Sequence, residues 1–169
     1  MASVKEDVLA ALGALGIPYE LLEHAPVHTM EDCKAAEEAL GGVMPKNLFL
    51  TPRNHATHHL LIARAEAPFR TSRISRQLGV SRLSFATAEE LMEMLCTLPG
   101  AISPMGLLFD QERKVRLAID RALRGEERLL FHPCVNTATL AVSGADFFER
   151  LLPALGHEAT YVDMEEDAE

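Results

Sequence analysis

Apolar side chains recur every three to four residues at the start of the chain, at Val4, Val8, Leu9, Leu12 and Leu15. Such a pattern places apolar groups on one face of a helix. Gly16 and Pro18 follow it, and a glycine after the last turn with a proline shortly beyond is typical of a helix end. The sequence therefore predicts a first helix over residues 4–15.

Short apolar runs bounded by turn residues predict the β-strands. The clearest pair is NLFLT (residues 47–51) and HLLIA (residues 59–63), joined by a polar turn from Pro52 to Thr57. The runs LLFD and VRLAID flank the polar turn QERK, so we expect them to pair with each other. Further strands are expected in YELLEH, RLSFA, RLLFHP, ATLAVS and TYVDM.

Residues that typically cap a helix start predict four further helices. Thr87 with Glu90 forms a capping box before an apolar helix. That helix stops at LPGAISPMG, whose glycines and prolines predict irregular structure. The other predicted starts are Thr29 with Asp32 for a helix ending at Gly41-Gly42, Thr71 or Ser72 for a helix ending at Gly79, and Ser143 with Asp146 for a helix over 147–155.

Helices interrupt the strands irregularly, and several strand pairs resemble hairpins. This order predicts an α/β fold of the α+β type, with a mixed and largely antiparallel sheet that is curved or closed into a partial barrel and has helices packed outside it. With 169 residues, of which 48% are hydrophobic, the chain can bury one sizeable core. We expect a single domain over residues 1–163, followed by an acidic tail over residues 164–169.

Several classes of protein are disfavoured by motifs that the sequence lacks. No apolar run is as long as the roughly 18 to 20 residues of a membrane span, and the N-terminus has acids where a signal peptide needs a basic head, so we expect a cytoplasmic protein. The three cysteines have no CxxC spacing, which disfavours a zinc site and a disulfide framework. The nucleotide loops GxGxxG and GxxxxGK[ST] and the hydrolase turn GxSxG are also absent.

Charge is distributed unevenly along the chain. The net charge is −9, but residues 46–82 carry seven basic residues against the single acid Glu66, so this segment is +6 and the remainder is −15. A polyanion would have to bind this segment. The alternative is an ordinary solvated face whose arginines pair with acids elsewhere in the fold.

A lysine at the first residue of an apolar strand is the most suggestive candidate for chemistry. Lys46 can project from the end of the sheet and offer three donors to a phosphate or a developing oxyanion. The loop from Gly100 to Pro104 would complement it, since glycine lets backbone N–H groups approach a ligand and proline stiffens the loop. A solvated lysine and a simple connector are the alternative interpretations.

Two other clusters could carry chemistry but are less favoured. Cys134 stands two residues after His132, a spacing that puts both on one face of a strand without guaranteeing contact, and a buried structural cysteine is commoner than a nucleophile. His55, His58 and His59 could be metal ligands. Because His58 and His59 would face opposite ways and we expect no carboxylate partner nearby, we expect no metal site.

Five blocks of sequence, taken together, resemble the freestanding prolyl-tRNA editing proteins of the YbaK/ProX (PrdX) group, which are related to the editing insertion of bacterial prolyl-tRNA synthetases. The blocks are EHAPVHT, PKNLFL, QLGVSRLSFATAEEL, PGAISPMGLLFD and FHPCVNTATLAVS, in the order and spacing of that family. The resemblance covers residues 3 to about 163 and implies the family's mixed α/β fold on a curved sheet.

The resemblance also implies an activity, namely hydrolysis of alanine wrongly attached to proline tRNA. It gives Lys46 a role in activity through the phosphate or terminal ribose of the tRNA end, and it places the Gly100–Pro104 loop over the aminoacyl ester. The family uses no protein nucleophile and no cofactor or metal; the substrate's ribose hydroxyl assists while water attacks. The residues expected to bind substrate are Met44, Asn47, Gly100, Ala101, Ile102, Ser103, Pro104, His132 and Asn136, with Leu130 as a further wall.

The expected partner is misacylated proline tRNA, whose acceptor stem would contact the basic segment through Arg53, Arg70, Arg73 and Arg76. Prolyl-tRNA synthetase or translation factors are further candidate partners, and a monomer is expected. Two alternatives remain open: a deacylase of the YbaK type for cysteinyl- or seryl-tRNA, and a non-catalytic module that binds tRNA or a synthetase.

Overall fold

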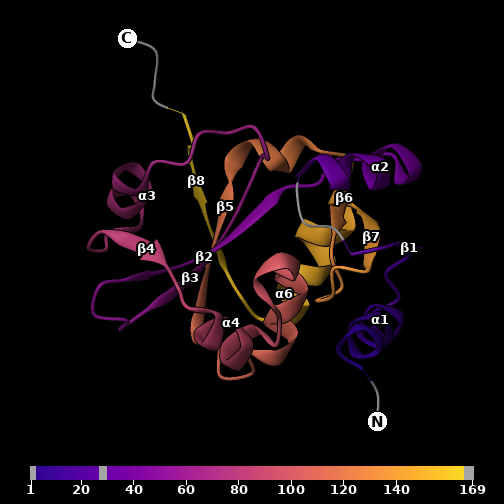
Figure 1. The fold of residues 1–169 in the computed structure, drawn as a ribbon, viewed down its shortest axis with the longest axis horizontal. Coiled ribbons are helices and arrows are strands. Elements are labelled where there is room, and N and C mark those ends of the chain that lie inside the picture. Colours follow the sequence, from indigo (N-terminus) through magenta and orange to yellow (C-terminus); the bar gives the residue numbers. More distant parts are fainter. Residues whose placement is uncertain (1–2, 27–29, 166–169) are drawn as a thin grey trace.

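Two β-sheets form the centre of the protein in a computed structural model that describes residues 3–26 and 30–165 (Figure 1). The smaller sheet is antiparallel and has the strand order β1-β7-β6. Its strands are β1 (Glu20–Glu23), β6 (Arg128–Phe131) and β7 (Ala138–Ser143). The hairpin of β6 and β7 confirms the strands predicted in RLLFHP and ATLAVS.

The larger sheet has five strands in the order β4-β2-β3-β5-β8 and is mixed. Neighbours β4, β2 and β3 are antiparallel, whereas β5 runs parallel to both β3 and β8. The bounds are β2 (Lys46–Pro52), β3 (His58–Ala63), β4 (Leu83–Phe85), β5 (Val115–Asp120) and β8 (Ala159–Val162). The mixed α/β class is confirmed, and the sheets described do not close into a barrel.

Helices pack around the sheets, as expected. Figure 1 shows α1 and α2 beside the small sheet, α3 beyond β4, and α4 below the large sheet. The C-terminal helical segment starts as α5, continues through a π-helical stretch and ends as α6, so the predicted helix over 147–155 is confirmed in position. The bounds are α1 (Val4–Ala14), α2 (Met30–Leu40), α3 (Thr71–Leu78), α4 (Ala88–Leu95), α5 (Gly144–Asp146), the π-helix η4 (Phe147–Leu151) and α6 (Leu152–Leu155). None of the helices described is long and apolar enough to cross a bilayer.

Two expectations for the middle of the chain are wrong. The segment LPGAISPMG is not irregular, because it forms the 3-10 turns η1 (Pro99–Ala101) and the start of η2 (Pro104–Phe109). LLFD is not a strand, since η2 covers its first three residues. Proline at the first position of each turn sets the backbone angle that such a turn needs. VRLAID, as β5, therefore pairs with β3 and β8 instead, and a third 3-10 turn, η3 (Arg121–Gly125), follows it.

Side-chain caps explain where several helices begin. The Thr87 hydroxyl accepts from Glu90 N–H at 3.1 Å while the Glu90 carboxylate accepts from Thr87 N–H at 2.7 Å, which confirms the capping box. Ser143 caps the C-terminal segment through Asp146 N–H, also as predicted. The prediction for α3 is wrong, because Arg70 occupies the cap position without a side-chain cap. Thr29, predicted to cap α2, lies outside the described residues.

Strands β2 and β3 are buried on both faces. Alternate residues pack into different apolar clusters: Phe49, Leu60 and Ile62 join a large core under α1, α4 and the C-terminal segment. Leu50, Leu61 and Ala63 join a second core with Ile74 of α3. Each such buried leucine or isoleucine contributes about 1.5–3 kcal/mol. This two-sided burial explains why HLLIA reads as a continuous apolar run rather than an alternating one.

One residue links the two sheets. Val43 donates its N–H to Arg128 O at 3.1 Å and accepts at its own carbonyl from Leu130 N–H at 2.9 Å. The preceding Gly42 lies so close to β6 that a β-carbon there would be 2.4 Å from Leu130 Cδ1. The start of β2 is therefore attached to the edge of the small sheet.

A buried hydrogen bond between a histidine and a carboxylate ties the segment after η2 to the chain before β8. The Asp110 carboxylate accepts from His157 Nε2 at 2.9 Å, and both side chains are buried. It also accepts from the backbone N–H groups of Lys114 and Val115, at 3.0 and 2.8 Å. Replacing one partner of such a network leaves several buried groups unsatisfied.

We expect Asp110→Ala to lower the free energy of unfolding by about 3–5 kcal/mol, because it breaks a buried pair and leaves two backbone donors without an acceptor. Urea unfolding followed by circular dichroism measures this loss. The matched control is Glu112→Ala, which removes a carboxylate from the exposed pair with Lys114 and should leave the midpoint almost unchanged. Equal midpoints for the two variants would contradict the structural role of Asp110.

Candidate active site at the start of strand β2

Lys46 is the first residue of β2, as the sequence predicts, and lies opposite Ala63 of β3. Its side chain is half-buried. The ammonium group donates a hydrogen bond of 2.5 Å to the carbonyl oxygen of Ala67, in the connection between β3 and α3. The lysine is therefore held at the end of the sheet by a neutral acceptor, which a charged acceptor could replace with a stronger bond.

Asn47 points to the other face of β2, since successive strand residues alternate. Its Nδ2 donates to Pro45 O at 3.4 Å. Its Oδ1 is buried and has no hydrogen-bond partner within residues 3–26 and 30–165. A buried acceptor left unsatisfied costs about 1–3 kcal/mol, so this oxygen would gain from a donor on a ligand.

The Gly100–Pro104 loop is built from the junction of the two 3-10 turns η1 and η2. Ser103 is fully buried, and its hydroxyl accepts from Met105 N–H at 3.1 Å, which starts η2. Ala101 is buried, Ile102 is half-buried against the large core, and Gly100 is exposed. The Ser103 cap and the two prolines stiffen the loop, and its exposed end is the glycine.

The structure brings this loop beside the segment that follows β6. A β-carbon built on Gly100 would lie 3.8 Å from Asn136 Nδ2, so the Asn136 side chain lies next to the loop. Two of the predicted substrate-binding blocks, far apart in the sequence, therefore meet in the fold.

His132 is the first residue after β6, and it is half-buried between the end of β6 and the start of β7. Its Nδ1 bonds to the carbonyl oxygen of Ala138 at 2.9 Å, and its ring centre is 6.4 Å from that of His24. Burial lowers the pKa of His132 despite that hydrogen bond, and the nearby His24 adds to the effect. His132 is thus a neutral imidazole at physiological pH, suited to lining a pocket or orienting a donor.

The spacing of Cys134 from His132 suggested that both lie on a strand, but Cys134 does not. β6 ends at Phe131, and Cys134 adopts a left-handed backbone conformation with φ of 63° in the turn that follows. Burial, and to a lesser extent the nearby Cys96, raises the pKa of the Cys134 thiol to about 12. The thiol is therefore protonated at neutral pH and poorly suited to act as a nucleophile.

Met44 and Leu130, two of the predicted pocket walls, pack together with Cys33 and Ala141. Met44 also borders a cavity of about 430 Å³ beside α2. Most of the other residues around that cavity are charged, but the surface they present to it is largely apolar; they are Lys34, Glu37, Val43, Arg64, Ala65, Glu66 and Glu126.

Two arginines of the basic segment bind within the fold. Arg73 donates to the backbone carbonyl oxygens of Asp163 and Glu165, and Arg64 pairs with Asp120 at 2.8 Å and with Glu165 at 3.1 Å. The alternative interpretation, in which arginines of this segment pair with acids elsewhere in the fold, is thus correct for Arg64. Arg73 binds the chain's own backbone. The arginines at positions 53, 70, 76 and 82 are exposed to solvent.

A carboxylate that the sequence did not associate with the histidines lies between two of them. Glu90 Oε1 is 2.5 Å from His55 Nδ1 and 3.0 Å from His58 Nε2. Burial opposes ionisation of Glu90, but hydrogen bonds from Thr87 N–H, His58 and His55 outweigh it and lower the pKa of Glu90 to about 2. The expectation that no carboxylate lies nearby is wrong, because α4 begins beside the β2–β3 turn. The capping box was recognisable in the sequence, but the second role of Glu90 was not.

His59 faces away from this cluster, as predicted for a neighbour on the same strand. Its Nε2 lies 2.9 Å from the Thr57 hydroxyl. Burial, together with the charges of Arg116 and His58, lowers the pKa of His59 to about 4. It is a neutral core residue.

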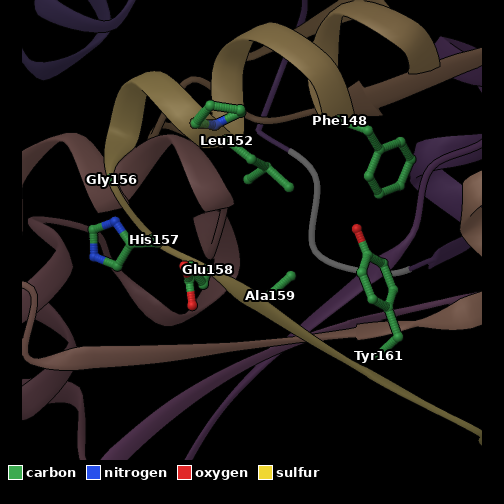
Figure 2. Close-up of a pocket in the computed structure, with 8 residues that line it drawn as sticks. Phe148, Leu152, Gly156, His157, Glu158, Ala159 and Tyr161 are labelled. Carbon is green, nitrogen blue, oxygen red and sulfur yellow. The ribbon is translucent and has the colours of Figure 1, made fainter.

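A separate cavity of about 590 Å³ lies between the C-terminal helix and β8. Figure 2 shows Phe148 and Tyr161 at one side of it and His157 at the other, with Leu152 between them. The predicted site residues do not line this cavity.

Comparisons with known proteins identify the family of this chain. The sequence model of the aminoacyl-tRNA editing domain matches residues 24–149. Prolyl-tRNA editing protein ProX of Acetoanaerobium sticklandii is 31% identical over 160 residues, which cover 95% of this chain and 97% of that protein. Prolyl-tRNA synthetase associated domain-containing protein 1 of Danio rerio is 31% identical over 88% of this chain and 81% of its own length.

Solved structures share the fold at lower identity. The crystal structure of a candidate trans-editing enzyme for prolyl-tRNA synthetase superposes with a TM-score of 0.71 at 18% identity, over 98% of this chain and 99% of that one. The uncharacterised protein APE2540 gives a TM-score of 0.72 at 18% identity, over 93% and 99% of the two chains. With the family match spanning most of its length, this chain belongs to the aminoacyl-tRNA editing domain family.

Proposed function

We propose that this protein is a trans-editing deacylase that hydrolyses the ester of alanine wrongly attached to proline tRNA. The observation that carries the proposal is the 31% identity to a prolyl-tRNA editing protein over nearly the full length of both chains. Such an enzyme would act where translation takes place, in the cytoplasm. Its substrate partner would be misacylated proline tRNA.

The chemistry of amino-acid selection explains why such an enzyme is needed. A synthetase pocket made for proline cannot strongly exclude alanine, because each missing methylene reduces binding by only about 1–3 kcal/mol. A second site that admits alanine and excludes the larger proline removes the error. Met44, which borders the cavity beside α2, and the half-buried Ile102 would supply apolar surface for such a site.

In the proposed reaction, water attacks the ester carbonyl carbon and the bond to the ribose oxygen breaks, which gives free alanine and tRNA. The substrate's neighbouring ribose hydroxyl assists, so a protein nucleophile is not required. Lys46 exchanges its bond to Ala67 O for the phosphate or developing oxyanion of the substrate. Because Asn47 points to the other face of β2, its buried Oδ1 would accept from a donor on a different part of the tRNA end from the group that Lys46 contacts.

The loop and the basic segment complete the proposed site. Backbone N–H groups of Gly100, Ile102 or Ser103 would lie over the ester, with Asn136 beside Gly100 to hold the loop or contact the ribose. The exposed arginines at positions 53, 70 and 76 would bind acceptor-stem phosphates. Arg73 contributes less, since it is engaged with the backbone of the chain's own C-terminal segment.

Deacylation assays should show rapid loss of alanine from proline tRNA and sparing of proline, because proline is too large for the site. The assay compares proline tRNA charged with alanine, cysteine, serine or proline. Faster loss of cysteine or serine would instead assign the YbaK-type activity. Binding of the charged tRNA with no loss of any ester would identify a binding module and overturn the proposal.

Lys46→Ala should lower kcat/KM for alanyl-tRNA by about 100-fold or more, the usual effect of removing a group that stabilises a developing charge. The thermal transition should change little, because within the described residues the Lys46 side chain donates one hydrogen bond, at a strand end. The control is Lys114→Ala, which removes an exposed lysine far along the chain. If Lys46→Ala is as active as this control, the assigned role is wrong.

A reaction without a protein nucleophile predicts that Cys134→Ala retains close to wild-type kcat, since the buried thiol is protonated and takes no part. The same alanyl-tRNA assay measures this, with circular dichroism as a check on folding. An inactive but folded Cys134→Ala protein would require the thiol mechanism to be reconsidered.

A further inference from the structure

The turn between β2 and β3 and the first turn of α4 form a cluster of two imidazoles and one carboxylate. The cluster consists of His55, His58 and Glu90, and one ligand-type atom from each lies within 4.8 Å of the others. Both imidazole nitrogens approach the same carboxylate oxygen, at 2.5 and 3.0 Å. This set lies apart from the residues proposed for ester hydrolysis.

Each member of the cluster is held by its own local structure. The second oxygen of Glu90 accepts from Thr87 N–H in the capping box, which leaves the first oxygen directed at the histidines. The His58 ring stacks on Phe49, with ring centres 5.6 Å apart and planes inclined by 26°. His55 sits in the turn with φ of 55°, and its N–H donates to Pro52 O at 2.9 Å.

Two of the three separations among these atoms are close to those of a metal site, and the third, between the two imidazole nitrogens, is at most 4.8 Å. Zinc binds histidine nitrogen and carboxylate oxygen at about 2.0–2.2 Å, so neighbouring ligand atoms of a tetrahedral site are about 3.3 Å apart. The observed separations of 2.5 and 3.0 Å need to widen by less than an ångström. Each neutral imidazole can carry its proton on the other ring nitrogen, which frees the facing nitrogen to bind a metal ion.

We propose that His55, His58 and Glu90 bind a divalent transition-metal ion, zinc in the first place, with a fourth position open to water or an anion. Two histidines and a glutamate are an established ligand set for zinc with an open position. The proposal replaces the expectation, drawn from the sequence, that the chain has no metal site.

The surroundings of the cluster are consistent with an exchangeable fourth ligand. It lies in a cavity of about 590 Å³ that is also lined by Glu93, Arg113, Lys114 and Arg116. Glu93 adds negative charge near the ion. Lys114 is paired with Glu112 at 2.9 Å, and the arginines would attract an anion rather than compete for the metal.

The ion would act on stability rather than on ester hydrolysis. His58 and Ala63 lie at opposite ends of β3, which places them about 17 Å apart, and Lys46 pairs with Ala63. A bound ion would join the β2–β3 turn to α4. Because an ion that binds only the folded state stabilises it by mass action, zinc should raise the melting temperature.

The test uses the full-length protein without a histidine tag, freed of metal with EDTA and passed into EDTA-free buffer. Titration with zinc chloride in a calorimeter should give one site per chain, and zinc should raise Tm in a thermal scan. His58→Gln and Glu90→Gln should each weaken binding by more than about tenfold and abolish the Tm shift, since loss of a ligand costs more than loss of its supporting contacts.

Glu90→Gln is informative because glutamine can still form the capping-box hydrogen bond, so α4 keeps its start. Glu93→Gln is the matched control, a residue of the same helix and cavity that is not a proposed ligand, and it should bind zinc as the wild type does. The proposal would be overturned if zinc did not raise the Tm of the wild type, or if it raised the Tm of His58→Gln and Glu90→Gln as much as that of the wild type. The experiment does not involve tRNA and is independent of the deacylation assays.

Discussion

Burial on both faces fixes the register of the β2–β3 hairpin, and the candidate site depends on that register. Because side chains alternate along a strand, a slip by one residue would exchange Phe49 with Leu50 between two different apolar cores. The same slip would turn Lys46 and Asn47 to each other's faces. The apolar packing of this hairpin therefore determines which side of the sheet carries the ammonium group and which carries the unsatisfied amide oxygen.

Much of the fold could be predicted because local signals are strong where helices and hairpins begin. The Thr87–Glu90 capping box, the β2–β3 pair and the separate strands β6 and β7 were all recognisable in the sequence. The parallel neighbours of β5 could not be recognised, because parallel pairing joins segments that are distant in sequence and that no short turn connects. LLFD was mistaken for a strand because a short apolar run can equally well pack as a 3-10 turn.

The candidate site could be predicted in part for the same reason. Lys46 at a strand start and the stiff loop from Gly100 to Pro104 follow from local patterns. The approach of Asn136 to Gly100 and the meeting of Glu90 with two histidines depend on tertiary packing. Arg73 looked available for RNA because its partners are backbone carbonyls of the C-terminal segment, which no charge pattern reveals.

The attachment of Val43 to β6 makes the start of β2 sensitive to the small sheet. Both backbone groups of Val43 are bonded to that strand, and Gly42 lies in near contact with Leu130. A change in side-chain volume on β6 would therefore shift the lysine three residues further on. In such an architecture, pocket size and the position of the charged group cannot evolve separately, so a change of preferred amino acid would require compensating substitutions in both sheets.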